Sequence, residues 1–276
     1  MKKILVPTDF SEVANNAFVH ALELASKVDA ELLLLHTYEL PIVDNQFFPE
    51  NYQTIFDSLE MAQFEKFKEL VPKLHEIAED RKLQHIKFSH IIMDGDLVYN
   101  IKECIAKEGI YMVVMGTSGA TGWKEVFIGT NTGEVISSVN VPVLCIPAVA
   151  DFNYIKNIGF TTRFREKDKV ALTKTIEIAK LTHSKVKCLY VQTDSSDVVD
   201  DKITYWKEEF KNDPIQFFVI PNDEVTTTIL DFIINQEIDV LAMVRHKRNF
   251  FVNLFETSLA EKMSYKSEIP VLVLHE

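Results

Sequence analysis

Residues 111–119 have the sequence Tyr111-Met112-Val113-Val114-Met115-Gly116-Thr117-Ser118-Gly119, an apolar run that ends in a glycine-rich turn. A run such as Tyr111 to Met115, apolar at nearly every position, is typical of a strand that helices cover on both faces. Helical spacing follows from about Asn131 to Val139, and another apolar run spans Val143 to Ile146. This succession of strand, turn, helix and strand predicts an α/β fold.

The residues before this stretch also alternate between strand patterns and helix patterns. Ser11 and Asp96 each stand just before a helical pattern, where a side-chain oxygen can cap the first turn of a helix. We therefore predict a Rossmann-like domain, an open and doubly wound parallel sheet of five strands. The predicted strands are Lys3–Val6, Glu31–His36, Phe88–Met93, Tyr111–Met115 and Val143–Ile146.

The chain resembles itself at two fixed offsets. Residues 4–10 are similar to residues 158–164 at an offset of 154, and residues 141–144 are similar to residues 269–272 at an offset of 128. The difference between the offsets leaves 26 extra residues in the first half, between its second and third strands. Self-similarity at a fixed spacing indicates repeated structural units. The two domains that we predict are residues 1–148 and residues 149–276.

The extra residues include a segment of mixed apolar and proline residues, residues 39–56. Phe47 and Phe48 within it form either a lid or partner surface, or a loop that packs on its own domain. Apolar residues at helical spacing then predict a long helix that begins at about Phe56. Pro72 lies within that pattern, and proline is expected to kink the helix or to end it.

The composition disfavours several classes of partner. The chain has 41 acidic and 29 basic residues and a net charge of −12, which disfavours binding to nucleic acids and to anionic membrane surfaces. No stretch approaches the roughly 20 apolar residues of a membrane span. The apolar run after Met1 is also too short for a signal peptide. We therefore expect a cytoplasmic protein.

The sequence lacks the residue patterns of several kinds of active site. It contains no GxxxxGK[ST] phosphate loop, no GxGxxG after the first strand and no GxSxG turn. The histidines and carboxylates show neither metal-ligand spacing nor a triad, so we predict no catalytic residue and no metal site. Cys104, Cys145 and Cys188 are scattered, which favours buried free thiols over disulfides.

The pattern most specific to a function is Gly116-x₂-Gly119-x₉-Gly129-Thr130. Glycine permits positive φ and lets a ligand approach the backbone closely. Hydroxyl residues then open a helix, and the N–H groups of a helix N-terminus suit phosphate oxygens. The pattern also follows a strand, at the edge where open α/β sheets bind ligands. It therefore predicts a phosphate-binding segment.

This glycine pattern resembles the ATP-binding signature of the universal stress protein family. Residues 4–12 look like the first strand and loop of that family, and residues 141–144 look like its last strand. Because both halves share these features, the whole chain resembles a tandem universal stress protein. The resemblance implies Rossmann-like domains, adenine-nucleotide binding in one subgroup, a role in stress survival, and dimer-like pairing through the last strand. In this chain the two halves would pair with each other as a pseudo-dimer.

The resemblance also implies which residues contact the nucleotide. Asp9 matches the family's acidic contact at the adenosine end, in the loop that begins with Pro7 and Thr8. Thr37 and the third-strand tip, Met93 to Gly95, border the adenine, and the later matches bind ribose and phosphate. The implied ligand is ATP, with Mg²⁺ on its phosphates. The implied site residues are Pro7, Thr8, Asp9, Thr37, Met93, Gly95, Met115, Gly116, Gly119, Gly129, Thr130 and Asn131.

The second half departs from this pattern at the matched positions. Arg163 stands where the first half has Asp9. The positions that match Gly116, Gly119, Gly129 and Thr130 are occupied by Val244, Lys247, Thr257 and Ser258. Without glycine the backbone cannot readily wrap around phosphates, so we predict a structural partner that has lost the ATP site. The basic residues 245–248 are either a solvated loop or a group that holds an anion through side chains.

These observations predict a regulatory, nucleotide-binding stress protein whose first half holds ATP. Binding would cause a conformational change that is transmitted to an unknown protein partner. Two alternatives stay open. One is a slow ATPase or nucleotidyl-transfer enzyme, and the other is an interaction module that binds no nucleotide. Homodimerisation would require a further surface, and the segment that contains Phe47 and Phe48 is the candidate.

Overall fold

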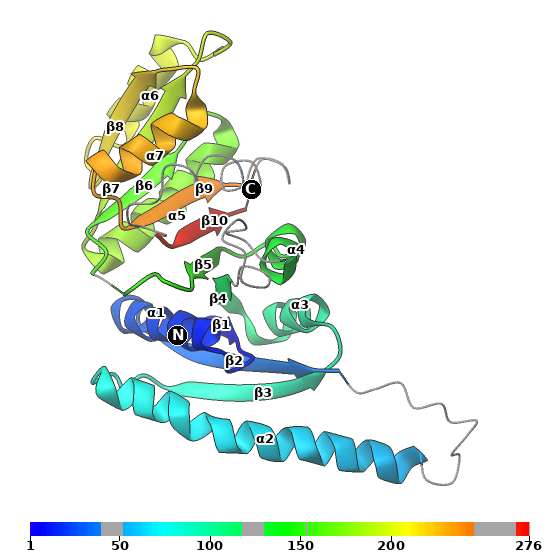
Figure 1. Ribbon diagram of the computed structural model, residues 1–276. Helices are drawn as coiled ribbons and strands as arrows, with labels where there is room; N and C mark the ends of the chain where they lie inside the picture. The colour runs from blue at the N-terminus through cyan, green and yellow to red at the C-terminus, as the bar shows by residue number, and fades with distance from the viewer. Residues whose placement is uncertain (40–51, 118–129, 153, 246–268, 276) are drawn as a thin grey trace. The chain divides into compact units, whose positions relative to one another are not determined.

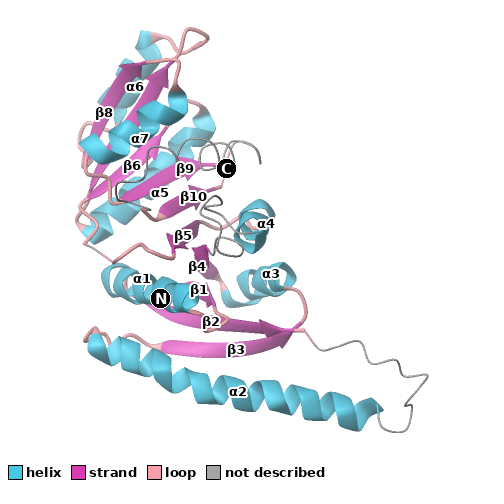
Figure 2. Ribbon diagram, in the orientation of Figure 1, coloured by secondary structure: helices cyan, strands magenta, loops and turns pink. Residues whose placement is uncertain are grey.

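The computed structural model describes residues 1–39, 52–117, 130–152, 154–245 and 269–275 (Figures 1 and 2). Contacts within the chain define two compact units, Met1–Met115 and Gly116–Glu276. Each unit combines a mostly parallel sheet with helices, so the predicted α/β class is confirmed. The segment that contains Phe47 and Phe48 lies outside the described residues, and its role stays a prediction.

The first unit is built on four parallel strands in the order β3-β2-β1-β4. Right-handed crossovers place the two helices between β1, β2 and β3 on one face and the helix before β4 on the other. The contact between α1 and α2 agrees with this arrangement. The elements are β1 (Lys2–Pro7), α1 (Glu12–Val28), β2 (Ala30–Tyr38), α2 (Tyr52–Asp80), β3 (Phe88–Asp94), α3 (Leu97–Glu108) and β4 (Ile110–Thr117), whose last two residues fall in the second unit.

Helices α1 and α3 begin where the sequence predicts, whereas α2 begins at Tyr52, four residues before the predicted start at about Phe56. Ser11 Oγ accepts a 3.2 Å hydrogen bond from the Ala14 N–H, and Asp96 Oδ1 accepts one of 2.8 Å from the Tyr99 N–H. Each bond satisfies an N–H group that the first helical turn leaves without a partner. The alanine-rich face of α1 is buried against β1 and β2, as its helical spacing predicts.

Helix α2 continues through Pro72 as one helix, so the alternative in which proline ends it is wrong. Proline removes the hydrogen bond to the carbonyl four residues earlier, here that of Lys68. Both residues are exposed, so water can hydrate that carbonyl. Phe67 and Leu74, by contrast, are buried and hold the helix on its unit.

In the described part of the second unit, the sheet has the strand order β5-β10-β9-β6-β7-β8. Its neighbouring strands are parallel except for β5 and β10, which are antiparallel. The elements are α4 (Thr130–Ser138), β5 (Val143–Pro147), β6 (Asn157–Thr161), α5 (Glu166–Thr182), β7 (Lys185–Gln192), α6 (Asp200–Glu209), β8 (Ile215–Pro221), α7 (Val225–Asn235), β9 (Val240–Val244) and β10 (Val271–Leu274).

Strands β5 and β10 join the final strands of the two sequence halves. Val273 is paired with Val143 and Val271 with Cys145, and all four residues are fully buried. The predicted pairing of these strands within one chain is therefore confirmed. It covers two apolar edges that would otherwise be open to pairing with other chains. The predicted boundary near residue 148 rests on the sequence repeat, and it stays a prediction.

The two halves have the same backbone features at positions 154 residues apart. Phe10 and Phe164 have φ values of 62° and 54°, and Asp29 and His183 have values of 52° and 56°. In addition, the Thr8 and Thr162 N–H groups donate to the carbonyls of Leu35 and Leu189, at 2.8 and 2.9 Å. Positive φ is uncommon for residues other than glycine, so its recurrence at matched positions marks similar turns.

The three cysteines are buried free thiols, as predicted. Burial raises the pKa of the Cys145 thiol to about 12 and the pKa of the Cys188 thiol well above its ordinary value. The reactive thiolate is therefore suppressed at both positions near neutral pH.

No helix in the described ranges is long and apolar enough to cross a membrane.

Candidate functional site

The predicted site residues of the first unit lie at one edge of its sheet. Thr37 of β2 is paired with Met93 of β3, so these strand ends are neighbours. Because the strands are parallel, their carboxyl ends meet at the same edge, where open α/β sheets bind ligands. The residues that the fold brings to this edge are Pro7, Thr8, Asp9, Thr37, Met93, Gly95 and Met115.

A compact turn after β1 presents Asp9 to solvent. Thr8 is buried, and its Oγ1 accepts a 3.0 Å hydrogen bond from the Phe10 N–H. Asp9 Oδ1 accepts a hydrogen bond of the same length from the Ser11 N–H, next to the start of α1. The carboxylate is therefore exposed and also anchored, which orients it at the sheet edge.

Three ring side chains support this turn, and the sequence did not predict their contact. Phe10 lies 5.3 Å from His36 and 5.5 Å from Phe67 of α2, between ring centroids. His36 Nδ1 also donates a 2.8 Å hydrogen bond to the carbonyl of Thr8. Helical spacing predicted the long helix that contains Phe67, but it did not reveal which strand end this side chain would reach.

Gly95 forms an open position at the tip of β3. Its φ is +98°, which L side chains rarely adopt, and its N–H donates a 2.9 Å hydrogen bond to the Tyr38 carbonyl. A Cβ atom added to Gly95 would meet no atom of the described residues within 4 Å. The backbone here is therefore accessible to a ligand that lies against the strand tips.

The structure describes the two ends of the segment that connects β4 to α4. The Gly116 carbonyl accepts a 3.2 Å hydrogen bond from Oγ1 of Thr132, a buried residue of α4 that the predicted site does not include. Asn131 is exposed in the first turn of α4, and Thr130 is the first residue of that helix. Gly119 and Gly129 lie outside the described residues, so their predicted roles stay predictions.

Comparison with known proteins identifies the family. The sequence model of the universal stress protein family matches residues 1–147, which is more than half of the chain. The chain belongs to the universal stress protein family. Universal stress protein MJ0577 of Methanocaldococcus jannaschii is 33% identical over 155 residues, which cover 52% of this chain and 94% of that protein. Universal stress protein MJ0531 of the same organism is 28% identical over 145 residues, which cover 52% and 81%.

A solved universal stress protein from Archaeoglobus fulgidus DSM 4304 is similar over the whole length of this chain. The TM-score is 0.73 and the sequence identity is 17%, with 99% of this chain and 98% of that chain covered. The similarity shows that the fold of this chain also occurs in that solved protein.

In this universal stress protein, two basic side chains hold the C-terminal end of α4. Arg245, just after β9, donates from Nη1 to the carbonyls of Ile136 and Ser137, at 2.9 and 2.7 Å. His275 Nε2 donates a 2.9 Å hydrogen bond to the same Ile136 carbonyl. These bonds satisfy carbonyls that the end of a helix leaves without partners. The arginine also places positive charge at the negative end of the helix dipole.

Proposed function

We propose that this universal stress protein binds one ATP per chain, and that the first half of the sequence provides the nucleotide site. The observation that supports the proposal is the arrangement of parallel strand ends that brings Asp9, Thr37, Gly95 and Met115 to one sheet edge. The glycine pattern from Gly116 to Thr130, which suits phosphate oxygens, begins at the last of these strands.

The proposed roles follow from the chemistry of each group. The exposed Asp9 carboxylate accepts hydrogen bonds from ribose hydroxyls. The open backbone at Gly95 allows the flat adenine ring to lie against the strand tips. Backbone N–H groups of the glycine segment, with Thr130 and Asn131, bind the phosphates. Mg²⁺ bound to the phosphates needs few protein ligands, because it keeps several of its waters.

The proposed activity is regulatory binding, in which the occupancy of the site reports the adenine-nucleotide state to a protein partner. The described residues hold no group of three or more His, Cys, Asp or Glu side chains that could bind a metal ion. A family role in stress response fits a protein that responds to adenine nucleotides.

Calorimetric titration of the full chain with ATP, ADP and AMP tests the proposal. We expect saturable ATP binding with a stoichiometry near one, because the second half lacks the glycines. Mass spectrometry of the purified protein tests whether an adenine nucleotide copurifies with it. No heat of binding for any of the three nucleotides would refute the proposal, and a stoichiometry near two would refute the difference between the halves. Steady release of inorganic phosphate would favour the ATPase alternative.

A further inference from the structure

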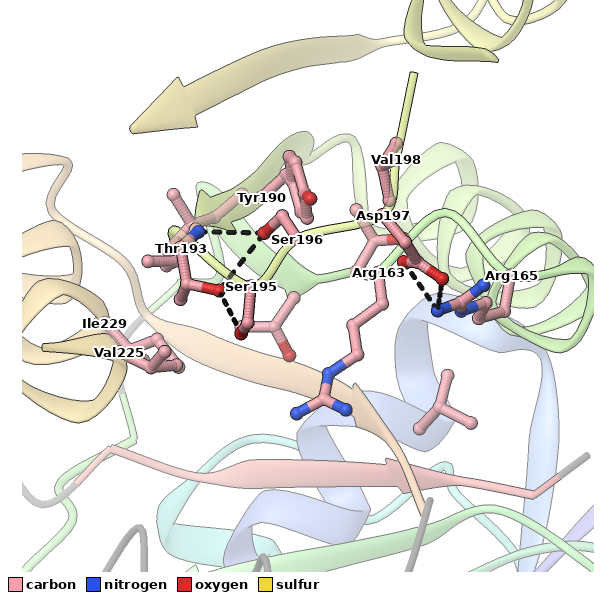
Figure 3. Close-up of a pocket in the computed structure, with 15 residues that line it drawn as sticks. Arg163, Arg165, Tyr190, Thr193, Ser195, Ser196, Asp197, Val198, Val225 and Ile229 are labelled. Carbon is pink, nitrogen blue, oxygen red and sulfur yellow. Dashed lines mark hydrogen bonds and ion pairs between the residues drawn. The ribbon is translucent and has the colours of Figure 1, made fainter. Parts of the chain in front are cut away.

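The second unit contains a cavity of about 330 Å³ at the carboxyl ends of β6, β7 and β9 (Figure 3). This volume is at the small end of the range for ligand pockets. In the strand order β9-β6-β7, the chain runs from β6 outward to β8 and returns to β9 on the other side of β6. The cavity therefore lies at a topological switch point, where open α/β sheets bind ligands.

One wall of the cavity carries a fixed group of hydroxyls. The Thr193 N–H donates a 2.8 Å hydrogen bond to Ser196 Oγ, and Thr193 Oγ1 lies 3.1 Å from Ser195 Oγ. These contacts fix the turn after β7, so the hydroxyls need little reordering to meet a ligand. An apolar wall is formed by side chains from β7, α7 and β9. Its residues are Leu189, Val191, Val225, Ile229 and Val244.

The charged residues in the described lining of the cavity are two arginines and one aspartate, Arg163, Arg165 and Asp197. Arg165 Nη2 donates to both carboxylate oxygens of Asp197, each at 2.8 Å. In Figure 3 the Arg163 side chain extends between this ion pair and the turn that carries the hydroxyls. A guanidinium beside hydroxyl donors is suited to an oxyanion.

The turn below these arginines differs from its counterpart in the first half. Fully buried Asp168 accepts hydrogen bonds at Oδ2 from the N–H groups of Arg163 and Arg165, at 2.7 and 3.2 Å. At the matched positions the first half has Ala14 and, in place of Arg163, Asp9. In the second half the carboxylate of Asp168 therefore lies beneath the turn. Arg163, a cation, stands at the position where the first half has the carboxylate of Asp9.

A polar group at the wall has no hydrogen-bond partner among the described residues. Tyr190 lines the cavity and is 3% exposed, and its Oη forms no hydrogen bond with the described part of the chain. A buried hydroxyl without a hydrogen-bond partner carries a free-energy cost. A ligand or water in the cavity would remove part of that cost.

We propose that the second half of the chain binds a small organic phosphate in this cavity, with Arg163 and the Thr193–Ser196 hydroxyls on the phosphate and the apolar wall on the organic part. The site would differ from an adenine-nucleotide site in holding the anion through side chains rather than through a glycine-rich backbone. The proposal is independent of ATP binding by the first half.

Phenyl phosphate, a phosphate on a small apolar body, is the probe for the test. It is titrated into the full chain, with and without saturating ATP, while amide NMR signals are followed. We expect saturable shifts at Tyr190, Thr193 and Ser195 that ATP does not abolish. We expect little binding of benzyl alcohol, which lacks the charge, and weaker binding of benzoate, which presents fewer oxygens.

Variants locate the site. Arg163→Gln is expected to weaken phenyl phosphate binding by about tenfold, because a charged hydrogen bond is lost. Lys185→Gln removes the same charge from the first residue of β7, at the opposite end of the strand, and should leave binding unchanged. If Arg163→Gln does not fold, Ser195→Ala serves instead, because that side chain is exposed. Equal affinity of the wild type and the variant, loss of the shifts on ATP addition, or equal binding of benzyl alcohol would each overturn the proposal.

Discussion

The guanidinium of Arg245 donates a 2.7 Å hydrogen bond to the carbonyl of Ser137. Ser137 lies in the last turn of α4, the helix whose first residue, Thr130, belongs to the glycine pattern. Arg245 occupies the position that matches Thr117 at the offset of 128. In the second half, the segment that matches the glycine pattern contains no glycine at the matched positions. Through Arg245 this segment stabilises α4, the helix that follows the glycine pattern in the first half.

Arg245→Met is expected to lower the free energy of unfolding by about 1 kcal/mol, because two hydrogen bonds at a half-exposed helix end are lost while the apolar stem is kept. Urea denaturation measures the change. Lys185→Met, at an exposed position, is the matched control and should be nearly neutral. A variant as stable as the wild type would show that these hydrogen bonds contribute nothing.

His275 predicts a pH dependence of stability. Burial lowers its pKa below the ordinary value of 6.5, despite the opposing hydrogen bond to the Ile136 carbonyl. As the pH falls below about 6.5, the unfolded chain takes up the proton before the folded chain does. The stabilisation by neutral His275 is therefore complete above that pH and is lost as the pH falls toward the folded pKa.

His275→Gln keeps a donor for the Ile136 carbonyl and removes the titration. We expect the difference in unfolding free energy between wild type and variant to change with pH in the window just below 6.5 and to be constant above it. Chemical denaturation at a series of pH values measures this difference. A difference that does not vary with pH would contradict the assignment to His275.

Gly119→Val and Gly129→Val are expected to weaken ATP binding by more than about tenfold, or about 1.4 kcal/mol, with a native circular dichroism spectrum. A β-branched side chain would fill the space that the phosphates need and would oppose positive φ. Thr257→Val makes the same residue at the matched position of the second half and should leave ATP affinity unchanged. If the glycine variants bind ATP normally, these glycines serve only to form turns.

The contact between the final strands predicts an energetic coupling between Val143 and Val273, which are paired across β5 and β10 and fully buried. Each Val→Ala change should cost about 2 kcal/mol. In a double-mutant cycle we expect a coupling of about 0.5 kcal/mol or more, since the side chains share one environment. Strict additivity of the two changes would contradict the direct contact.

Local sequence patterns were sufficient for the strands of the first half and for the starts of α1 and α3. The cap at Ser11 depends on an N–H group three residues away, and the strand signal depends on apolar residues in sequence. The family signature is local in the same sense, because each glycine acts on the backbone where it stands. For these reasons the α/β class, the parallel strands of the first unit and the residues at their carboxyl ends could be predicted.

The tertiary structure decided the contacts between distant positions. Phe67 supports the turn that presents Asp9, and Arg245 and His275 meet α4 across 109 and 139 positions. The cavity beside Arg163 likewise combines residues from three strands, two loops and a helix. Contacts at such separations form only when the packing of a whole unit compensates for the entropy of closing long loops, and no short stretch of sequence encodes that sum.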